Sequence, residues 1–323
     1  MFRSEHEFVR WVRGLAGRPS GRVRLGIGDD AALVEETAGQ DLILTTDMTI
    51  EEVHFRCDLH PPRAVGHRAL ARSLSDIAAM GGAPRYALVS LALSRRTKRA
   101  WLEGFWRGFA ALAKRFGVSL IGGDTALVAG RTLIDVMVAG EVSSGKALLR
   151  SGARPGDQIF VSGELGLSSL GLRLLKSRRR GRSSGEAAAV RSHLYPEPRC
   201  ALGRYLSERR LVSALIDLSD GLSTDLARLC EASGVGACVW GDRIPRPRLD
   251  ASQKSLDWAL HGGEDYQLLF TVPPRQVPRI PDHFGRLPLS RIGEIKRRRG
   301  VLLAGTDGRF EPLNPGGWDC FRK

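Results

Sequence analysis

The stretch Ala64–Pro84, AVGHRALARSLSDIAAMGGAP, decides how the first half of the chain folds. Leu70, Leu74 and Ile77 recur at the three- and four-residue spacing of one helix face, which predicts an amphipathic helix over Ala64–Met80. The Gly-Gly-Ala-Pro sequence that follows is a typical helix stop, because glycine suits the left-handed end of a helix and proline cannot continue it. Asp76 lies off the apolar stripe, close to these glycines.

Strand-like runs alternate with helices on both sides of this helix. In the first 150 residues, runs rich in β-branched and apolar residues predict strands at Val23–Ile27, Leu42–Thr46, Tyr86–Leu93 and Leu133–Glu141. A second amphipathic helix is expected at Trp101–Phe116. Later in the chain, strands are expected at Asp157–Ser162, Leu211–Leu218 and Asp265–Val272, and helices at Leu167–Leu175 and Leu222–Ser233.

The turn-rich sequence RSGARPGD, Arg150–Asp157, is the best candidate for a domain boundary. We therefore expect an α+β protein of two mixed α/β domains, residues 1–149 and residues 150–323. The chain of 323 residues fits this division, since a domain commonly holds about 100 to 200 residues.

The composition is that of an ordinary globular protein, with 42% hydrophobic and 26% charged residues, and it excludes disordered, collagen-like and coiled-coil chains. No apolar run approaches the roughly 18 to 20 residues that a membrane helix needs. The start, MFRSEHEFVRWVRG, is charged throughout and lacks the apolar core of a signal peptide. Five scattered cysteines without a C-x-x-C pair disfavour a disulfide framework and a zinc site. We expect a cytoplasmic protein that does not bind membranes.

The net charge of +14 allows a nucleic acid or an anionic substrate as partner. Nine basic residues stand in two clusters, KSRRRGR at Lys176–Arg182 and KRRR at Lys296–Arg299. Neither cluster has interleaved aromatic residues that would stack on bases. Nucleic acid is therefore an unlikely partner, although an RNA-binding protein that uses the arginine-rich loop stays open as an alternative.

Carboxylates stand at the edges of apolar runs, next to glycine or hydroxyl residues, in five short segments. These are GIGDDAAL with Asp29 and Asp30, LTTDMT with Asp47, SLIGGDTAL with Asp124, LIDLSDGLSTDL with Asp217 and Asp220, and HGGEDYQLLF with Glu264 and Asp265. Each alone is explained by helix capping or a turn. Gathered together, they would repel one another and require cations, and hard oxygen ligands suit Mg²⁺. Nearby glycines allow backbone N–H groups to approach phosphate oxygens. The set predicts a nucleotide site with several Mg²⁺ ions, although the P-loop and protein-kinase motifs are absent.

In these segments the chain resembles the thiamine-monophosphate kinase family of the aminoimidazole-ribonucleotide-synthetase-like ATP-binding superfamily. Eight ordered segments carry the resemblance, from about Leu25 to Phe321: GIGDDAAL, TTDMTIEEVHF, ALARSLSDIAAMGGAP, IGGDT, LLRSGARPGD, IDLSDGLSTDL, GGEDY and GGWDCF. The resemblance implies transfer of the γ-phosphoryl group of ATP to thiamine monophosphate. It also implies a homodimer whose interface is built by the strands of the N-terminal domain.

The resemblance further implies which residues form the site. The Mg²⁺ ligands would be Asp30, Thr45, Thr46, Asp47, Asp76, Asp124, Asp217 and Asp220, of which Asp47, Asp124 and Asp220 would be catalytic. Gly123, Arg150 and Ser219 would contact ATP, and His54, Glu264 and Trp318 the thiamine moiety. The basic stretch Lys176–Arg182 matches no part of the family pattern, and EEVHF is more acidic than expected.

Another ATP-dependent enzyme of the same superfamily, with a different acceptor, is the second alternative. Selenophosphate synthetase would need a reactive N-terminal Cys or selenocysteine beside a Lys, whereas the first Cys here is Cys57 and the first Lys is Lys98. Hydrogenase-maturation proteins end in a cysteine, whereas Cys320 is followed by Phe-Arg-Lys. The segments HF, GGED and GGWD favour thiamine monophosphate as the acceptor.

Overall fold

The computed structural model describes residues 5–17, 21–25, 33–34, 36–177, 183–247, 253–305 and 308–320. The chain divides into two compact units. The first comprises residues 1–77 and 83–145, and the second comprises residues 78–82 and 146–323. Each unit combines a sheet with helices, which confirms the predicted α+β class. None of the described helices combines the length and the hydropathy that crossing a bilayer requires.

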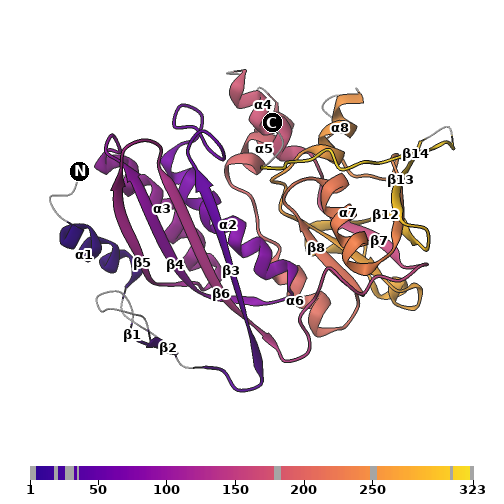
Figure 1. Cartoon of the computed structure of the whole chain (residues 1–323), viewed down its shortest axis with the longest axis horizontal. Helices are drawn as coiled ribbons and strands as arrows, with labels where there is room; N and C mark the ends of the chain where they lie inside the picture. The colour runs from indigo at the N-terminus through magenta and orange to yellow at the C-terminus, as the bar shows by residue number, and fades with distance from the viewer. Residues whose placement is uncertain are drawn as a thin grey trace. The chain divides into compact units, whose positions relative to one another are not determined.

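The first unit is built on a four-stranded sheet in the order β3-β6-β4-β5 (Figure 1). Only β4 and β5 run parallel to each other. The elements of this unit are α1 (Glu5–Ala16), β1 (Val23–Leu25), β2 (Leu33–Val34), β3 (Gln40–Ile50), α2 (Pro62–Ala79), β4 (Ala83–Ser94), α3 (Arg99–Phe116), β5 (Ser119–Val128) and β6 (Leu133–Ser143).

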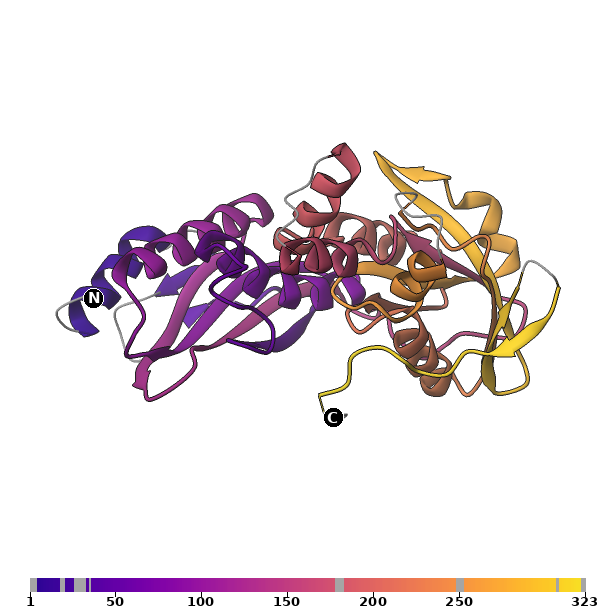
Figure 2. The ribbon, with the colours of Figure 1, turned by 90° about the horizontal axis from the view of Figure 1, so that it is seen from above.

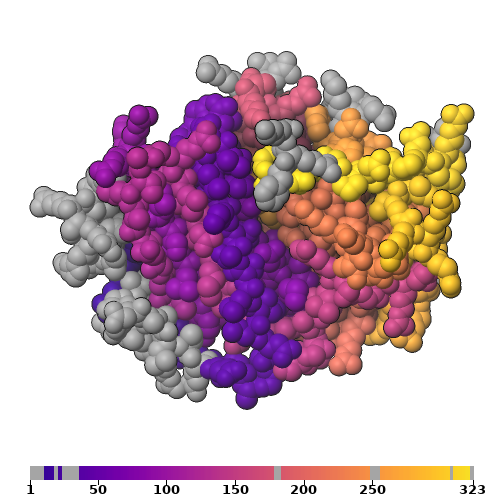
Figure 3. Space-filling model, viewed as in Figure 1, coloured from indigo at the N-terminus to yellow at the C-terminus, as the bar shows by residue number. Residues whose placement is uncertain are grey.

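The two faces of this sheet differ sharply. Helices α2 and α3 lie on one face (Figure 2), where Ser73 of α2 donates a hydrogen bond of 2.8 Å to the carbonyl of the buried Val136 on β6. On the opposite face β3 exposes Leu42, Leu44 and Met48, with 63%, 59% and 53% of each residue accessible. Figure 3 shows β3 at the surface. β3 therefore presents three large apolar side chains on this second face.

Glycines allow α2 and α3 to pack closely. A Cβ atom at Gly66 of α2 would lie 1.9 Å from the carbonyl oxygen of Phe105, and one at Gly108 of α3 would lie 1.9 Å from that of Arg63. Real Cβ atoms do not approach backbone oxygens this closely. The position of α2 on the sheet thus depends on two residues that have no side chain.

The second unit contains an eight-stranded sheet in which β14-β13-β9-β12-β7-β10-β8 are neighbours and β11 pairs with β12. The core on one face joins α7 and α8 to the strands through residues such as Leu226, Leu260 and Ile216. The elements are β7 (Gln158–Ser162), α4 (Leu167–Lys176), α5 (Ser184–Leu194), α6 (Cys200–Glu208), β8 (Ala214–Leu218), α7 (Leu222–Ser233), β9 (Gly236–Trp240), α8 (Gln253–His261), β10 (Gln267–Val272), the 3₁₀ helix η1 (Pro274–Arg279), β11 (His283–Phe284), β12 (Leu287–Lys296), β13 (Gly300–Ala304) and β14 (Phe310–Pro312).

Most expected elements are present, with differences at their ends. Helix α7 has the predicted bounds, whereas α2 ends at Ala79 and β4 already begins at Ala83. The strand expected from Leu211 begins only at Ala214. The strand expected from Asp265 begins at Gln267, because Glu264 and Tyr266 have positive φ angles of 66° and 49° that a strand does not allow.

We expect Gly108→Ala to destabilise the protein by about 1 to 3 kcal/mol, because the added methyl group would force α3 away from the Arg63 carbonyl. Gly14→Ala is the matched control, since it also lies in a helix but has open space around it. It should leave stability unchanged or raise it slightly. Thermal unfolding of both variants tests this, and a Gly108→Ala protein that melts no earlier than the parent would contradict it.

Candidate active site

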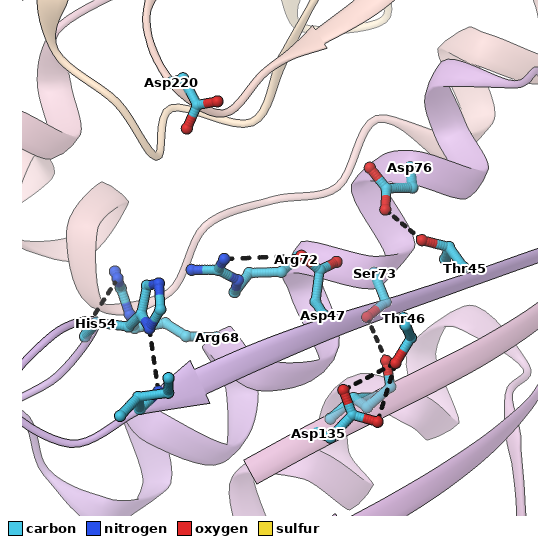
Figure 4. A network of polar contacts seen from close by, with 12 residues as sticks. Thr45, Thr46, Asp47, His54, Arg68, Arg72, Ser73, Asp76, Asp135 and Asp220 are labelled. Atoms are coloured by element: carbon cyan, nitrogen blue, oxygen red, sulfur yellow. Dashed lines mark hydrogen bonds and ion pairs between the residues drawn. The ribbon is translucent and has the colours of Figure 1, made fainter. Parts of the chain in front are cut away.

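Thr45 and Asp47 lie two residues apart on β3, on the face that α2 covers. The Thr45 hydroxyl donates to a carboxylate oxygen of Asp76, and a guanidinium nitrogen of Arg72 lies 3.6 Å from a carboxylate oxygen of Asp47 (Figure 4). Residues i and i+2 of a strand share a face, and residues i and i+4 of a helix share a stripe. The Thr45–Asp76 pair and the Asp47–Arg72 pair are therefore neighbouring contacts between β3 and α2. We call this set of four residues the β3–α2 seam. It unites three of the predicted metal ligands.

Thr46 lies between them in sequence, but its side chain faces the other side of the sheet. Its hydroxyl donates to both carboxylate oxygens of Asp135 on β6, at 2.8 and 2.9 Å. The alternation of side chains along a strand separates it from Thr45 and Asp47. The Thr46 side chain therefore does not join the seam, although the sequence placed all three in one ligand set.

Gly123 and Asp124 lie within β5, not in a turn between elements. Gly123 has a φ angle of 151°, and a Cβ atom there would lie 2.0 Å from the Val89 carbonyl oxygen, so only glycine fits. In the ladder, Asp124 pairs with Ser90, and Ser90 with Asp135, so Asp124 stands in the row of Asp135. Its carboxylate accepts a hydrogen bond of 2.8 Å from the amide of the next residue and is exposed.

His54 is fixed by the turn that follows β3. Its Nδ1 accepts a hydrogen bond of 3.0 Å from the amide of Ile50, so that a neutral ring carries its proton on Nε2. Its carbonyl accepts a hydrogen bond of 3.4 Å from the guanidinium of Arg68, a buried residue of α2 (Figure 4). The His54 ring is thus oriented by its own backbone turn.

In the second unit, three segments that are far apart in sequence meet at the turn after β8. The Glu264 amide donates to the Ser219 carbonyl at 2.7 Å, and the Trp318 amide donates to the Asp220 carbonyl at 3.0 Å. Gly317 allows the last approach, since a Cβ atom there would lie 1.9 Å from the Asp220 oxygen. Four predicted site residues, Ser219, Asp220, Glu264 and Trp318, are thereby brought together. The Trp318 residue is 51% exposed.

Asp225 supports this turn from the first turn of α7. One of its carboxylate oxygens accepts the amides of Asp220 and Gly221 at 3.0 and 3.1 Å, and the other accepts a 3.0 Å bond from Arg228, which also pairs with the Asp220 carboxylate. Burial, together with the negative charge of Asp220, raises the pKa of Asp225 to about 6. The predicted ligand Asp217 is buried on β8, three residues before Asp220.

Asp265 supports the neighbouring turn. Its carboxylate accepts the amides of Gly166 and Ser168 at the start of α4. Burial nevertheless raises the pKa of Asp265 to about 7, because the cost of desolvating the charged form outweighs these two bonds. Beside it, Nδ1 of the buried His193 lies 3.0 Å from the Ser168 hydroxyl and 3.9 Å from a Glu264 carboxylate oxygen.

Two further predicted residues are not part of these groups. Arg150 is exposed, and its backbone carbonyl accepts a 3.0 Å hydrogen bond from the Ser233 hydroxyl. Asp30, with its neighbour Asp29, lies outside the described residues. Of the Mg²⁺ set, Thr45, Asp47 and Asp76 therefore lie together in the first unit. In the second unit, Asp217 lies on β8 and Asp220 in the turn that follows β8.

The β3–α2 seam has donors of the kind that Mg²⁺ prefers. Asp47 and Asp76 offer carboxylate oxygens and Thr45 a hydroxyl, and Mg²⁺ is commonly held by one or two carboxylates together with water and phosphate oxygens. Within the described ranges, no group of three or more His, Cys, Asp or Glu side chains forms a complete metal cage. The seam thus fits an ion that is shared with a phosphate-bearing ligand.

Arg72, Asp135 and Asp225 are site residues that the sequence did not single out, and Asp265 was named among the carboxylates but given no role. Arg72 could have been found, because it stands four residues before Asp76 and therefore on the same helix stripe. Asp225 stands in the quoted segment LIDLSDGLSTDL, five residues after Asp220, but its contact with the backbone of the turn is not visible in the sequence. Asp135 pairs across the sheet with Met48, a relation that requires the strand register.

We expect the Asp265 carboxyl to make folding stability depend on pH. A carboxyl group whose pKa is raised by folding, from about 4 to about 7, stabilises the folded state at low pH, and this contribution is lost as the pH rises through that interval. Asp265→Asn removes it. The melting temperature of the parent protein minus that of Asp265→Asn should therefore fall between pH 4.5 and 8.

The exposed Asp257→Asn on α8 serves as the control, and its difference from the parent should stay flat. A difference for Asp265→Asn that is constant or grows with pH would contradict the burial of this carboxyl group.

Comparison with known proteins identifies the family. The AIR synthase related protein family matches with its N-terminal domain at residues 28–142 and with its C-terminal domain at residues 154–304. The thiamine-monophosphate kinase of Bacillus subtilis is 36% identical over 93% of this chain and 94% of its own.

Two solved structures are similar over almost the whole chain. The thiamine-monophosphate kinase of Stenotrophomonas maltophilia has a TM-score of 0.81 and 35% identity, covering 94% of this chain and 96% of its own. AaThiL complexed with AMPPCP and TMP has a TM-score of 0.79 and 31% identity, covering 99% of both chains. The chain therefore belongs to the thiamine-monophosphate kinase family, a family of enzymes within the AIR synthase related proteins.

Proposed function

We propose that this enzyme transfers the γ-phosphoryl group of ATP to thiamine monophosphate, giving thiamine diphosphate and ADP. The observation that carries the proposal is the full-length similarity to AaThiL, whose structure holds AMPPCP and TMP. The β3–α2 seam adds a local argument, since it offers oxygen donors for Mg²⁺ beside a guanidinium that suits a phosphate.

The proposed function gives the predicted residues three roles. Asp47, Asp76 and Thr45 in the first unit, and Asp217 and Asp220 in the second, would hold Mg²⁺. Of the other expected ligands, Asp30 lies outside the described residues, and any ion held by Thr46 or Asp124 would lie on the other face of the sheet from the seam. Gly123, Arg150 and Ser219 would contact ATP. His54, Glu264 and Trp318 would contact the thiamine moiety. An indole face against a cationic thiazolium ring would stabilise the complex by roughly 0.5 to 2 kcal/mol.

The chemistry requires little from the protein beyond positioning. The acceptor is a phosphate monoester with a second pKa near 6, so it is mostly dianionic at neutral pH and needs no general base. Its oxygen forms a bond to the γ-phosphorus while the bond between that phosphorus and the bridging oxygen of ADP breaks. Bound Mg²⁺ would supply the neutralising charge, and the aspartates would fix where that charge lies. We propose direct in-line transfer without a phosphoenzyme.

The open face of the first unit's sheet supports a homodimer. Leu42, Leu44 and Met48 stand in a row on the edge strand β3, and a patch of this kind commonly marks an interface between subunits. We propose that a second copy of this chain covers it.

Phosphorus NMR of the enzyme with ATP, Mg²⁺ and thiamine monophosphate tests the function. We expect the signals of thiamine diphosphate and ADP, absent when EDTA is added or the acceptor is omitted. ATP consumption without thiamine diphosphate would indicate a different acceptor within the same superfamily.

The RNA-binding alternative requires a separate test. Residues 178–182 lie outside the described residues, and Lys296 of the second basic cluster pairs with Glu294 at 2.9 Å. Retention on an RNA column that falls with salt and is lost on deletion of Lys176–Arg182 would favour this alternative. We expect no such difference.

We expect Asp47→Asn to lower kcat by on the order of 100-fold, because a neutral amide neither binds a cation nor pairs with Arg72 as a carboxylate does. Asp58→Asn, an exposed carboxylate paired with Arg56, is the control and should keep full turnover. Steady-state kinetics at saturating Mg²⁺, with circular dichroism to verify the fold, decide the matter. Near-normal turnover of Asp47→Asn would remove Asp47 from the metal site.

We expect Leu44→Arg to convert the dimer to monomers, because burying an unpaired charge at the centre of an apolar interface is strongly unfavourable. Leu302→Arg, at an exposed leucine of the second unit, should leave the oligomeric state unchanged. Sedimentation velocity measures both. A Leu44→Arg protein that sediments as a dimer would place the interface elsewhere.

A further inference from the structure

After β14 the chain continues as an extended stretch that belongs to no helix or strand (Figure 1). We call residues 314–319 the C-terminal strap. Leu313, directly before the strap, is packed in the core of the second unit, whereas residues 314–316 are exposed. Burial of apolar side chains therefore does not fix the first half of the strap.

Two consecutive amides of the strap donate to hydroxyl groups in the first turn of α7. The Gly316 amide lies 3.2 Å from Ser223 Oγ, and the Gly317 amide lies 3.0 Å from Thr224 Oγ1. Ser223 is fully buried and Thr224 is 9% exposed. The amide that follows, that of Trp318, donates to a backbone carbonyl of the turn before the helix. Three amides in a row thus dock the strap on the start of α7.

The strap can lie this close to α7 only because its two glycines have no side chain. A Cβ atom at Gly316 would lie 2.6 Å from Nδ1 of His261, the last residue of α8, and one at Gly317 would lie 2.7 Å from Thr224 Oγ1. The same His261 nitrogen lies 2.9 Å from Ser223 Oγ. A serine hydroxyl can accept one hydrogen bond while it donates another. Ser223 can therefore accept the Gly316 amide and donate to His261, so that α8 braces one of the two hydroxyls.

The same turn of α7 also holds the turn that contains Asp220. Asp225, the residue after Thr224, accepts the amides of Asp220 and Gly221. Side chains at successive positions of one helical turn thus fix both the strap and the Asp220 turn. The proposed thiamine contact Trp318 and the proposed metal ligand Asp220 are thereby held at a fixed separation within the second unit. A fixed separation suits an acceptor that carries a ring at one end and a phosphate at the other.

We propose that Ser223 and Thr224 are positioning residues for Trp318. Their hydroxyls dock the strap and so hold the Trp318 indole in the place where it meets the thiamine moiety. The inference rests on the proposed function for the role of Trp318. Neither hydroxyl needs to touch a substrate, because both act through the backbone of the strap. A side chain that is held in advance loses less conformational freedom when its ligand binds. Docking of the strap should therefore raise the affinity for thiamine monophosphate and leave that for the nucleotide unchanged.

Hydrogen exchange of the full-length enzyme without ligands measures the docking directly. Thr224→Val nearly keeps the shape of the side chain but removes the acceptor of the Gly317 amide, whereas Thr224→Ser keeps the hydroxyl. We expect the amides of residues 316–318 to exchange about 5-fold faster in Thr224→Val and within about 2-fold of the parent in Thr224→Ser. Thr271→Val removes a buried hydroxyl of β10 that lies 2.7 Å from Ser213 Oγ. It is the matched control and should leave this exchange unchanged.

Calorimetric binding in the presence of Mg²⁺ measures the consequence for the ligands. The affinity for thiamine monophosphate should fall about 5- to 20-fold in Thr224→Val, while that for AMPPCP should change by less than about 2-fold. Ser223→Ala should act in the same direction in both measurements. The loss should vanish in a Trp318→Ala background, because two residues that act through one contact are not additive. A hydroxyl that serves stability alone would change both affinities or neither.

Three results would overturn the inference. Exchange in Thr224→Val that matches the parent would show that the hydroxyl does not dock the strap. Faster exchange with unchanged affinity for thiamine monophosphate, where Trp318→Ala lowers that affinity, would overturn the positioning of Trp318 and leave the proposed function intact. A parent enzyme that binds no thiamine monophosphate would instead refute the proposed function, and a Trp318→Ala protein that binds it as the parent does would refute the contact with Trp318. The positioning role falls in both of these cases.

Discussion

Half-buried charges between β3 and α2 impose the strongest constraint on the first unit. Asp47 on β3 and Asp76 on α2 lie beside a largely apolar sheet face, on which Val136 and Val138 are buried opposite Asp47 and Thr45. Carboxylates in such a place require partners, and Arg72 and the Thr45 hydroxyl meet this need. The pairing works only if α2 lies at a fixed height and rotation over β3. The close α2–α3 contact at Gly66 and Gly108 holds it there, so packing and electrostatics depend on the same helix position.

In the second unit, backbone hydrogen bonds hold the predicted site residues in place. The turn at Ser219 and Asp220 is held by amides from Glu264 and Trp318, while the buried Asp225 holds the amides of the turn itself. Because glycines line these contacts, segments almost a hundred residues apart can approach within hydrogen-bond distance. The exposed groups of the turn are thereby fixed without a large side-chain network. Such preorganisation suits a reaction in which positioning contributes most of the catalysis.

Much of this was predictable from sequence where periodicity and composition agree. The α2 and α7 helices, the apolar strands and the glycine-flanked carboxylates follow from local pattern, and the family follows from their order. The sequence does not reveal how the strands pair with one another, that is, their register. Thr45 and Thr46 are adjacent and chemically alike, yet only the pairing of β3 with β6 decides which one faces α2. The same holds for Gly123, whose place inside β5 depends on its contact with Val89, and for Asp265, whose burial arises from its distant partner α4.

The central proposal is that the β3–α2 seam holds a divalent cation shared with phosphate. Crystals of the enzyme grown with Mn²⁺, AMPPCP and thiamine monophosphate would test this directly through the anomalous scattering of manganese. We expect an anomalous peak within coordination distance of the Asp47 or Asp76 carboxylate, with a phosphate oxygen as a further ligand of the same ion. Manganese peaks that touch neither carboxylate in the fully liganded enzyme would contradict the account.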